Sequence, residues 1–211
     1  MTMLIALEGI AASGKSTLRN QILDRAQARS LTMTHLGQFS WLSLRSTRSL
    51  VALRTARDAV AEDDALGAVL DDLALHMQNN LAPAARLGDV IADRLVLSTA
   101  CMLATAYQRS VDGYVSTLIR HTGIRPDLTI LVTTAPELCQ QRLAQRRAAT
   151  RPTDTPDSAV VLDELYQQAA SESERCTGTP LWRRELNAPE DTARTADEVL
   201  NQLLSQNAGG T

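Results

Sequence analysis

The chain has 211 residues, of which 44% are hydrophobic and 21% are charged, so it is long enough for one domain with a sizeable core and too short for two comfortable ones. A net charge of −3 excludes a global basic field for nucleic acid, and no apolar run approaches the roughly 18 residues of a membrane span. The cysteines Cys101, Cys139 and Cys176 are scattered without CxxC spacing, and the N-terminus lacks a signal pattern. We therefore expect a cytoplasmic protein with one domain over residues 1–211 and no nucleic-acid or membrane partner.

Short apolar runs alternate with segments of helical periodicity along the chain. Strands are predicted over residues 3–8, 31–35, 89–93, 127–134 and 181–186. Helices are predicted over residues 15–29, 60–87, 159–175 and 191–206, with further helices that end near Gln108 and begin at Pro136. A basic amphipathic segment covers residues 40–57, and a polar, Arg- and Pro-rich loop covers residues 146–158. This alternation predicts a parallel sheet covered by helices on both faces, with ligands at the carboxyl ends of the strands.

The stretch "LEGIAASGKST" contains the first functional motif. Gly9, Gly14, Lys15 and Ser16 fit G-x-x-x-x-G-K-[ST] without a mismatch, between a predicted strand and a predicted helix. Glycines let successive backbone N–H groups curl around phosphate oxygens, and the helix that follows points its positive end at them. We expect an exposed Lys15 that reaches the β- and γ-phosphates and a Ser16 hydroxyl that ligates Mg²⁺. The predicted nucleoside triphosphate site consists of Gly9, Ala12, Ser13, Gly14, Lys15, Ser16 and Thr17.

Asp93 and Arg94 end the predicted strand in "DVIADRLVLST". In P-loop proteins an acid at this strand tip lies near the metal and the acceptor hydroxyl, and an adjacent arginine can clamp a phosphate. The alternative is an ion pair at the strand end or a helix cap. Beside a P-loop we favour a catalytic and metal-binding role for Asp93 and a catalytic role for Arg94.

The segment "RLAQRRAATRPTD" carries Arg142, Arg146, Arg147 and Arg151. These arginines fit a lid that neutralises charge on the transferring phosphoryl group, and the alternative is a solvated helix face. We assign a catalytic role to Arg147 and nucleotide binding to Arg142 and Arg146, although spacing alone does not select among them.

The chain resembles the thymidylate kinase family of P-loop nucleoside monophosphate kinases. The resemblance is carried in order by "LEGIAASGKST", "VIADRLVLST", "RPDLTILVTTAPELCQQRLAQR" and "ADEVLNQLL". It implies a three-layer fold with a five-stranded parallel sheet, ATP with Mg²⁺ as the donor, and transfer of the γ-phosphate to a nucleotide-like small molecule in a cleft across from the P-loop. By position, Lys15 and Ser16 are the phosphate and Mg²⁺ residues, Asp93 and Arg94 match the Asp-Arg pair of the family, and the arginines of 142–151 match its short lid. A homodimer remains open.

The residues expected to contact the acceptor depart from the family pattern. The family usually has an aspartate in the P-loop where this chain has Ala11. Its usual Arg-Glu-Pro-Gly run is replaced by "THLGQFSWLSLR", which has no arginine before Arg45, and its tyrosine after Asp-Arg is Leu95. Gln108 lies about five residues later than a base-binding glutamine would. The cations left for an acceptor phosphate are Arg94 and one of Arg45, Arg48 or Arg54.

Three functions therefore stay open. The chain is a nucleoside monophosphate kinase for dTMP or a relative, a kinase of another acceptor such as a nucleoside or specialised metabolite, or, least favoured, a regulatory nucleotide-binding ATPase. Phe39 and Trp41 follow a predicted strand and either stack on the acceptor or belong to the core. His35, His76 and His121 lack partners at ligand spacing, so no zinc site is predicted.

Overall fold

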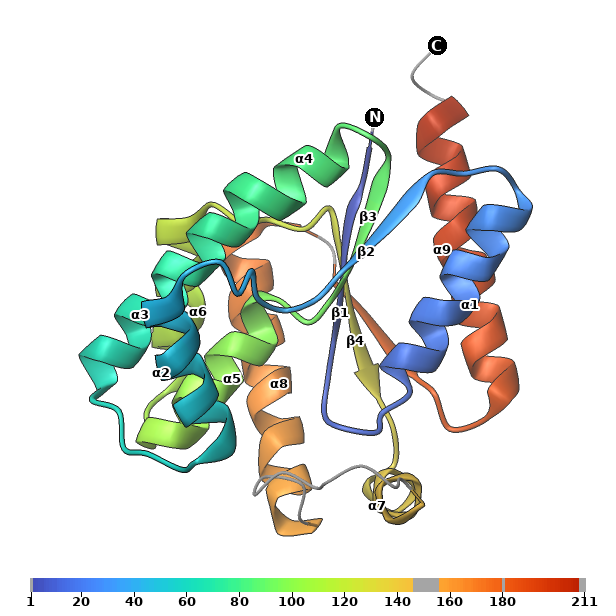
Figure 1. Ribbon diagram of the computed structural model, residues 1–211. Coiled ribbons are helices and arrows are strands. Elements are labelled where there is room, and N and C mark those ends of the chain that lie inside the picture. The colour runs from blue at the N-terminus through green and yellow to red at the C-terminus, as the bar shows by residue number, and fades with distance from the viewer. Residues whose placement is uncertain (1, 146–155, 180, 209–211) are drawn as a thin grey trace.

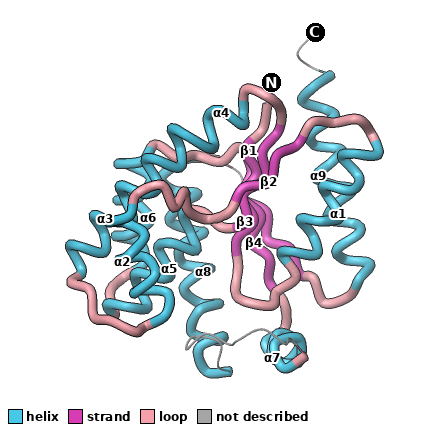
Figure 2. Tube along the Cα trace, in the orientation of Figure 1, coloured by secondary structure: helices cyan, strands magenta, loops and turns pink. Residues whose placement is uncertain are grey.

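Five parallel strands form one central sheet between two layers of helices in the computed structural model, which describes residues 2–145, 156–179 and 181–208 (Figures 1 and 2). The strands are β1 (Leu4–Glu8), β2 (Met33–Leu36), β3 (Asp89–Asp93), β4 (Leu128–Thr133) and β5 (Leu181–Glu185). Their spatial order is β2-β3-β1-β4-β5, and each neighbouring pair is parallel. The predicted α/β fold with a five-stranded parallel sheet flanked by helices is confirmed.

The helices divide between the two faces of the sheet (Figure 1). One face is covered by α1 (Lys15–Ala28) and α9 (Pro189–Ala208). The other face is covered by α2 (Leu44–Thr55), α3 (Glu62–His76), α5 (Val96–Tyr107), α6 (Val111–Thr122) and α8 (Pro156–Thr177). The short α7 (Pro136–Ala144) lies beyond the carboxyl end of β4 (Figure 1).

The central strand β1 shows why the sheet needs helices on both faces. Ile5 and Leu7 pack in the apolar cluster with residues of α1 and α9, whereas Ala6 between them packs in the cluster on the opposite face. Alternate side chains of a strand point to opposite faces, so a strand that carries apolar side chains on both faces must be covered twice. The core is almost entirely aliphatic because only 3% of the residues are aromatic.

The helix predicted over residues 60–87 is interrupted. It consists of α3, the π-helical segment η1 (Met77–Leu81) and α4 (Ala82–Ala85). Pro83 has no N–H group, and in a regular helix its ring would collide with the carbonyl of residue 79. The wider π turn just before Pro83 accommodates this proline.

One other helix begins a few residues away from its predicted start, and one helix was not predicted. Helix α8 begins at Pro156, so residues 156–158 of the predicted loop are helical, and the remaining loop residues 146–155 lie outside the described part of the chain. Helix α6 (Val111–Thr122) is not among the predicted elements. Within the described residues, no helix combines the length and the apolar character that a membrane crossing requires.

Helix α3 holds the loop between β2 and α2 through two buried polar side chains. The carboxylate of Asp72 accepts hydrogen bonds from Ser40 N at 2.8 Å, Ser40 Oγ at 2.8 Å and Trp41 N at 3.0 Å. His76 Nε2 lies 2.9 Å from the carbonyl oxygen of Gly37. Together these contacts fix the loop that leads from the sheet to α2.

The buried imidazole of His76 makes protein stability depend on pH. The side chain is 1% exposed, and burial lowers its pKa below the ordinary value. A lowered folded-state pKa contributes stability that is present above the unfolded pKa and lost as pH falls through the folded pKa. We therefore expect the free energy of unfolding to fall by about 1 kcal/mol more between pH 7 and pH 5 in the wild type than in His76→Gln.

Urea denaturation at both pH values measures this difference. The exposed His121→Gln variant is the matched control and should follow the wild type. Parallel pH curves for the wild type and His76→Gln would contradict the prediction.

Candidate functional site

The loop from β1 to α1 curls tightly at the carboxyl edge of the sheet. Gly9, Ala12 and Gly14 have positive φ angles of 135°, 61° and 102°. A Cβ atom at Gly9 would lie 2.3 Å from the carbonyl oxygen of Val132, so only glycine fits there. The glycines of the motif therefore have the steric role that the sequence predicts.

The N-terminus of α1 is arranged to accept an anion. Gly14 is the N-cap and has no side chain to cap the first turn. The side chains of Ser16 and Thr17 are exposed in that turn. The amide groups of the first turn need acceptors, and oxygen atoms of a phosphate supply them together with a favourable helix dipole. The loop thus fits a phosphate group.

Lys15 points into the loop and is buried, which corrects the prediction of an exposed side chain. It is 5% exposed, and its Nζ donates hydrogen bonds to Gly9 O at 2.9 Å, to Ile10 O and to Ser13 Oγ at 3.1 Å. The physical reason is that the curled loop turns two carbonyl oxygens toward the ammonium group. Burial lowers the pKa of Lys15 well below its ordinary value. Lys15 is also the single lysine among the 211 residues.

Arg142 reaches the same loop from α7. Its Nη2 donates to Leu186 O at 3.0 Å, and its Nη1 lies 3.4 Å from Ala12 O. This places the predicted nucleotide-binding arginine beside the phosphate loop. Arg146, Arg147 and Arg151 of the predicted lid lie outside the described residues.

The last residue of β1 joins the phosphate loop to the next part of the site. Glu8 is buried, and its carboxylate accepts hydrogen bonds from the backbone N–H groups of Leu95, Leu97 and Ser98 at 2.8, 3.1 and 3.0 Å, and from Ser98 Oγ. Burial raises the pKa of Glu8, against the opposing effect of these hydrogen bonds. Glu8 thereby caps the N-terminus of α5.

Asp93 is the last residue of β3, and Arg94 lies in the strained turn that follows it. Arg94 has a φ angle of 74°, and its backbone N donates to Leu7 O at 2.9 Å. Asp93 Oδ2 accepts from Arg19 Nη1 of α1 at 2.9 Å, and both side chains are about one-fifth exposed. Arg19 Nη1 also lies 3.3 Å from His35 Nε2. The ion pair named above as an alternative for Asp93 is therefore present, at the predicted strand end.

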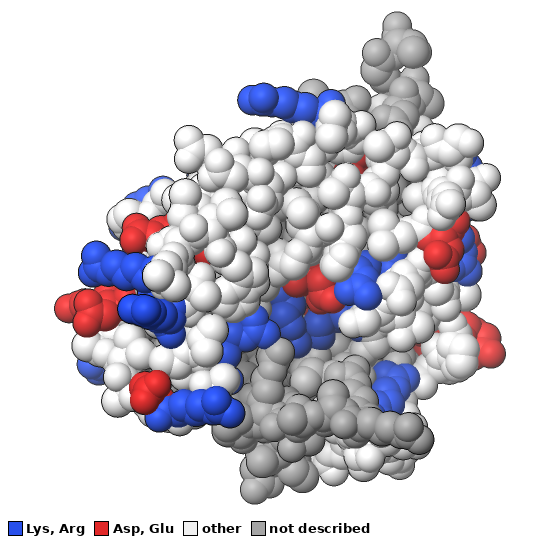
Figure 3. Space-filling model, in the orientation of Figure 1, with Lys and Arg blue, Asp and Glu red and all other residues white. Residues whose placement is uncertain are grey.

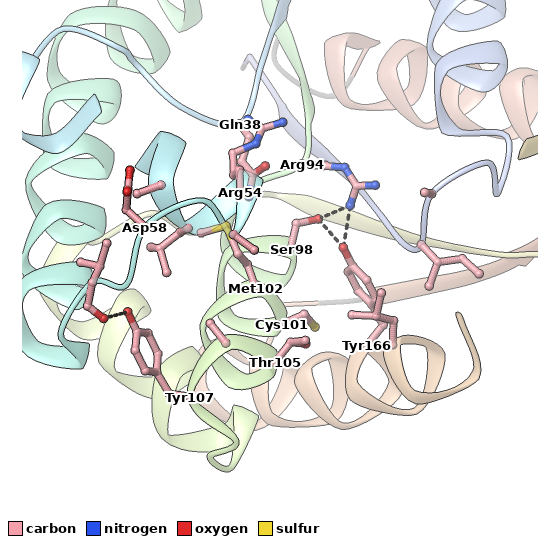
Figure 4. Close-up of a pocket in the computed structure, with 18 of the residues that line it drawn as sticks. Gln38, Arg54, Asp58, Arg94, Ser98, Cys101, Met102, Thr105, Tyr107 and Tyr166 are labelled. Atoms are coloured by element: carbon pink, nitrogen blue, oxygen red, sulfur yellow. Dashed lines mark hydrogen bonds between the residues drawn. The ribbon is translucent and has the colours of Figure 1, made fainter. Parts of the chain in front are cut away.

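The Arg94 side chain connects the phosphate loop to α8. Its Nη1 donates to Gly9 O at 2.8 Å, to Ser98 Oγ at 2.9 Å and to Tyr166 OH at 2.6 Å (Figure 4). Ser98 Oγ and Tyr166 OH are themselves 2.7 Å apart. Burial raises the pKa of Tyr166, which keeps its phenol protonated. One guanidinium group thus joins three elements that are distant in sequence.

A cavity of about 540 Å³ opens next to this cluster. Ile10 and Ala11 of the phosphate loop form part of its wall, and residues of α2, α5 and α8 and of the segment after α2 form most of the rest (Figure 4). Basic side chains gather in a hollow on the face seen in Figure 3, with acidic side chains beside them. Of the candidate acceptor cations, Arg94 and Arg54 line the cavity, whereas Arg48 does not and Arg45 lines a separate polar groove between α2 and α3.

Three other residues considered for contact with the acceptor do not line this cavity. Gln108 is exposed at the C-terminus of α5, and its Nε2 donates to Thr105 O at 2.8 Å. Phe39 is buried, and Trp41 is 43% exposed and packs edge-to-face against it at 5.4 Å between ring centroids. None of the three lines the cavity, whereas the neighbouring Tyr107 does.

Four residues of the site are absent from the sequence predictions. They are Glu8, Arg19, Ser98 and Tyr166. The spacing of Arg94 and Ser98, four residues apart at the start of a helix, is a signal that could have found Ser98. Tyr166 lies 72 residues from Arg94, and no local pattern connects them.

The oxygen ligands at the start of α1 and the end of β3 suit Mg²⁺ rather than a softer metal. Ser16 and Asp93, the predicted metal residues, offer a hydroxyl and a carboxylate oxygen. Among the described residues, no group of three or more His, Cys, Asp or Glu side chains is placed to hold a metal ion. Mg²⁺ commonly takes only one or two protein ligands and completes its shell with phosphate oxygens and water, so the residues fit.

A loop of this shape, at the carboxyl edge of a parallel sheet and ahead of an uncapped helix, defines a P-loop nucleotide-binding protein. The family model described as thymidylate kinase matches residues 7–177. The chain therefore belongs to the thymidylate kinase family of ATP-dependent nucleotide kinases. No curated protein matches the chain.

Replacement of Lys15 separates the role of its charge from its role in the fold. We expect Lys15→Ala to lower the rate of phosphoryl transfer by about 10²-fold or more, because a preorganised cation is removed from the phosphates. The fold should persist, since the sheet and both helix layers make no use of the ammonium group. ADP release and urea denaturation measure the two effects.

The matched control is Arg25→Ala, on the same helix, whose partner Asp197 lies on α9. Near-normal turnover of Lys15→Ala would contradict the assignment of the phosphate loop.

Proposed function

We propose that this enzyme transfers the γ-phosphate of ATP to a small molecule other than dTMP. The observation that carries the proposal is the composition of the cavity wall beside the phosphate loop. Ala11 stands there, and the cations among the described lining residues are Arg54 and Arg94. The donor half of the family site is retained, and the acceptor half is rebuilt.

In this proposal the phosphate loop holds the triphosphate of ATP. The backbone N–H groups from Gly9 to Thr17 bind phosphate oxygens, and Lys15 exchanges its carbonyl partners for the β- and γ-phosphates. Support comes from the uncapped N-terminus of α1 and from the direction of Lys15 into the loop. Arg142 stands beside the loop, and we assign it to the same nucleotide.

Asp93 and Arg94 are proposed to act on the transferring group. Asp93 accepts or orients the proton of the attacking hydroxyl, and Arg94 stabilises negative charge that develops in transfer. Arg19 holds the Asp93 carboxylate in place through their 2.9 Å ion pair. Ser16 and Asp93 would hold Mg²⁺, which when bound neutralises phosphate charge. Of the predicted lid, Arg147 keeps its proposed catalytic role and Arg146 its proposed role in nucleotide binding.

The charge of the cavity argues against a monophosphate dianion as acceptor. A buried phosphate needs cationic partners, and each charge-assisted hydrogen bond contributes about 1.5–3 kcal/mol. The family's arginine after the second strand, which would be such a cationic partner, is absent. An acceptor with a free hydroxyl and less charge has no need of such partners. A nucleoside or a hydroxylated metabolite therefore fits better than dTMP.

Asp93→Asn tests the proposed role in transfer. The amide keeps the size of the side chain but cannot take a proton, so we expect kcat to fall by about 10²-fold. The KM for ATP should change far less than kcat, because the phosphate loop supplies most of the contacts to the triphosphate. Steady-state kinetics measure both values.

The matched control is Asp127→Asn, at the opposite end of the sheet, where the carboxylate accepts from Leu4 N. An effect on ATP affinity alone would make Asp93 a binding or structural residue.

Kinetics with dTMP test the choice of acceptor. At saturating ATP and Mg²⁺ we expect kcat/KM for dTMP to stay below about 10⁴ M⁻¹s⁻¹, the lower end of the ordinary enzyme range. A screen of nucleosides, monophosphates and hydroxylated metabolites for ADP release supplies the comparison. A value for dTMP above that limit would show that the rebuilt pocket still accepts thymidylate.

A further inference from the structure

The cavity of about 540 Å³ beside the phosphate loop has a wall of definite chemistry, and this inference rests on the proposed function. Much of the wall is built from aliphatic side chains and methionine. They include Ile10, Ala11, Ala52, Leu53, Met102 and Leu162. The volume lies within the range of pockets that enclose a whole small molecule.

Two polar side chains on the cavity wall, Tyr107 and Gln38, are paired within the protein, whereas the buried Thr105 Oγ1 has no hydrogen-bond partner among the described residues. Tyr107 OH donates to Val60 O at 2.9 Å. Gln38 Nε2 donates to Thr99 Oγ1 at 3.0 Å. A ligand that competed for these groups would have to break existing hydrogen bonds, which favours a ligand body that makes few of its own.

The polar groups near the phosphate loop form one cluster. Ser98, Tyr166 and Arg94 lie together at the end of the cavity next to the loop, whereas Asp58 and Tyr107 lie farther away (Figure 4). A hydroxyl group of a ligand would find donors and acceptors at this end. The cavity is thus polar where transfer would take place and largely apolar beyond it.

The two cations of the described wall have protein partners. Arg94 Nη1 serves three acceptors, as described above. The guanidinium carbon of Arg54 lies 5.9 Å from the centroid of the Phe39 ring and 5.6 Å from that of Trp41. Asp58 adds a negative charge to the wall. These contacts and the Asp58 carboxylate offset part of the positive charge that a dianion would need.

We propose that the acceptor is an uncharged, hydroxyl-bearing molecule of about nucleoside size with a mainly apolar body. Its hydroxyl oxygen bonds to the γ-phosphorus of ATP while the bond from that phosphorus to the bridging oxygen breaks. ADP leaves with the electron pair of that bond, and the hydroxyl proton passes to the carboxylate of Asp93. The apolar body fills the cavity between α2, α5 and α8.

A neutral fluorescent probe tests the apolar character of the cavity without ATP. N-Phenylnaphthylamine gains fluorescence in apolar surroundings, and we expect saturable binding to the wild type. Met102→Glu places a charge on the cavity wall and should weaken the affinity for the probe by about tenfold or more. Ala106→Glu also places a charge on the cavity wall, and it should weaken probe binding in the same way. Ala106 is exposed to solvent, so the fold should tolerate a charge there.

The matched control is Val51→Glu on α2, which is 46% exposed and outside the cavity, and it should bind the probe like the wild type. Three results would overturn the proposal. They are the lack of probe binding, probe binding that both wall variants leave unchanged, and displacement of the probe by dTMP at submillimolar concentration.

The matched pair of thymidine and dTMP then compares acceptors that differ only in the phosphate. We expect the neutral member to displace the probe at a lower concentration. Because probe binding needs no ATP, failure there leaves the kinase proposal standing. Conversely, absence of ADP release with every acceptor, together with intact probe binding, would remove the proposed function and keep the apolar cavity.

Discussion

The buried carboxylate of Glu8 is the constraint on which both halves of the site depend. It ends β1, and it accepts the N–H groups at the start of α5. The phosphate loop begins at the next residue, so its first turn starts from a point that cannot move relative to α5. A buried carboxylate is costly unless it is fully hydrogen-bonded, and here the helix N-terminus supplies the donors. The first turn of α5 in turn lies beside the acceptor cavity.

Arg94 extends this connection to α8. It donates to Gly9 O of the phosphate loop and to Tyr166 OH of α8. The strained backbone at Arg94 sends its side chain to this cluster, while Asp93 pairs with Arg19 of α1. The Asp93 carboxylate, paired with α1, and the Arg94 guanidinium, which lines the cavity, are therefore neighbours in the chain. The donor and acceptor halves of the site thus share this turn.

The features that short contiguous segments determine were predictable from the sequence. The phosphate loop was predictable because its residues are contiguous and each has its own steric or hydrogen-bonding reason. The burial of Lys15 was not, since it depends on where two loop carbonyls point. Tyr166 was not predictable either, because only the packing of α8 on α5 brings it to Arg94. Pro83 did carry a local signal for the break in the long helix, and the apolar periodicity around it obscured that signal.

We propose that the phosphate loop binds ATP, whereas the neighbouring cavity binds nucleoside monophosphates poorly. Calorimetric titration of one protein preparation with a non-hydrolysable ATP analogue and Mg²⁺, and separately with dTMP, tests both parts in the absence of turnover. We expect a dissociation constant of about 10⁻⁵ M or tighter for the analogue, and a dissociation constant weaker than about 10⁻³ M for dTMP. Micromolar binding of dTMP, or the lack of binding by the analogue, would contradict it.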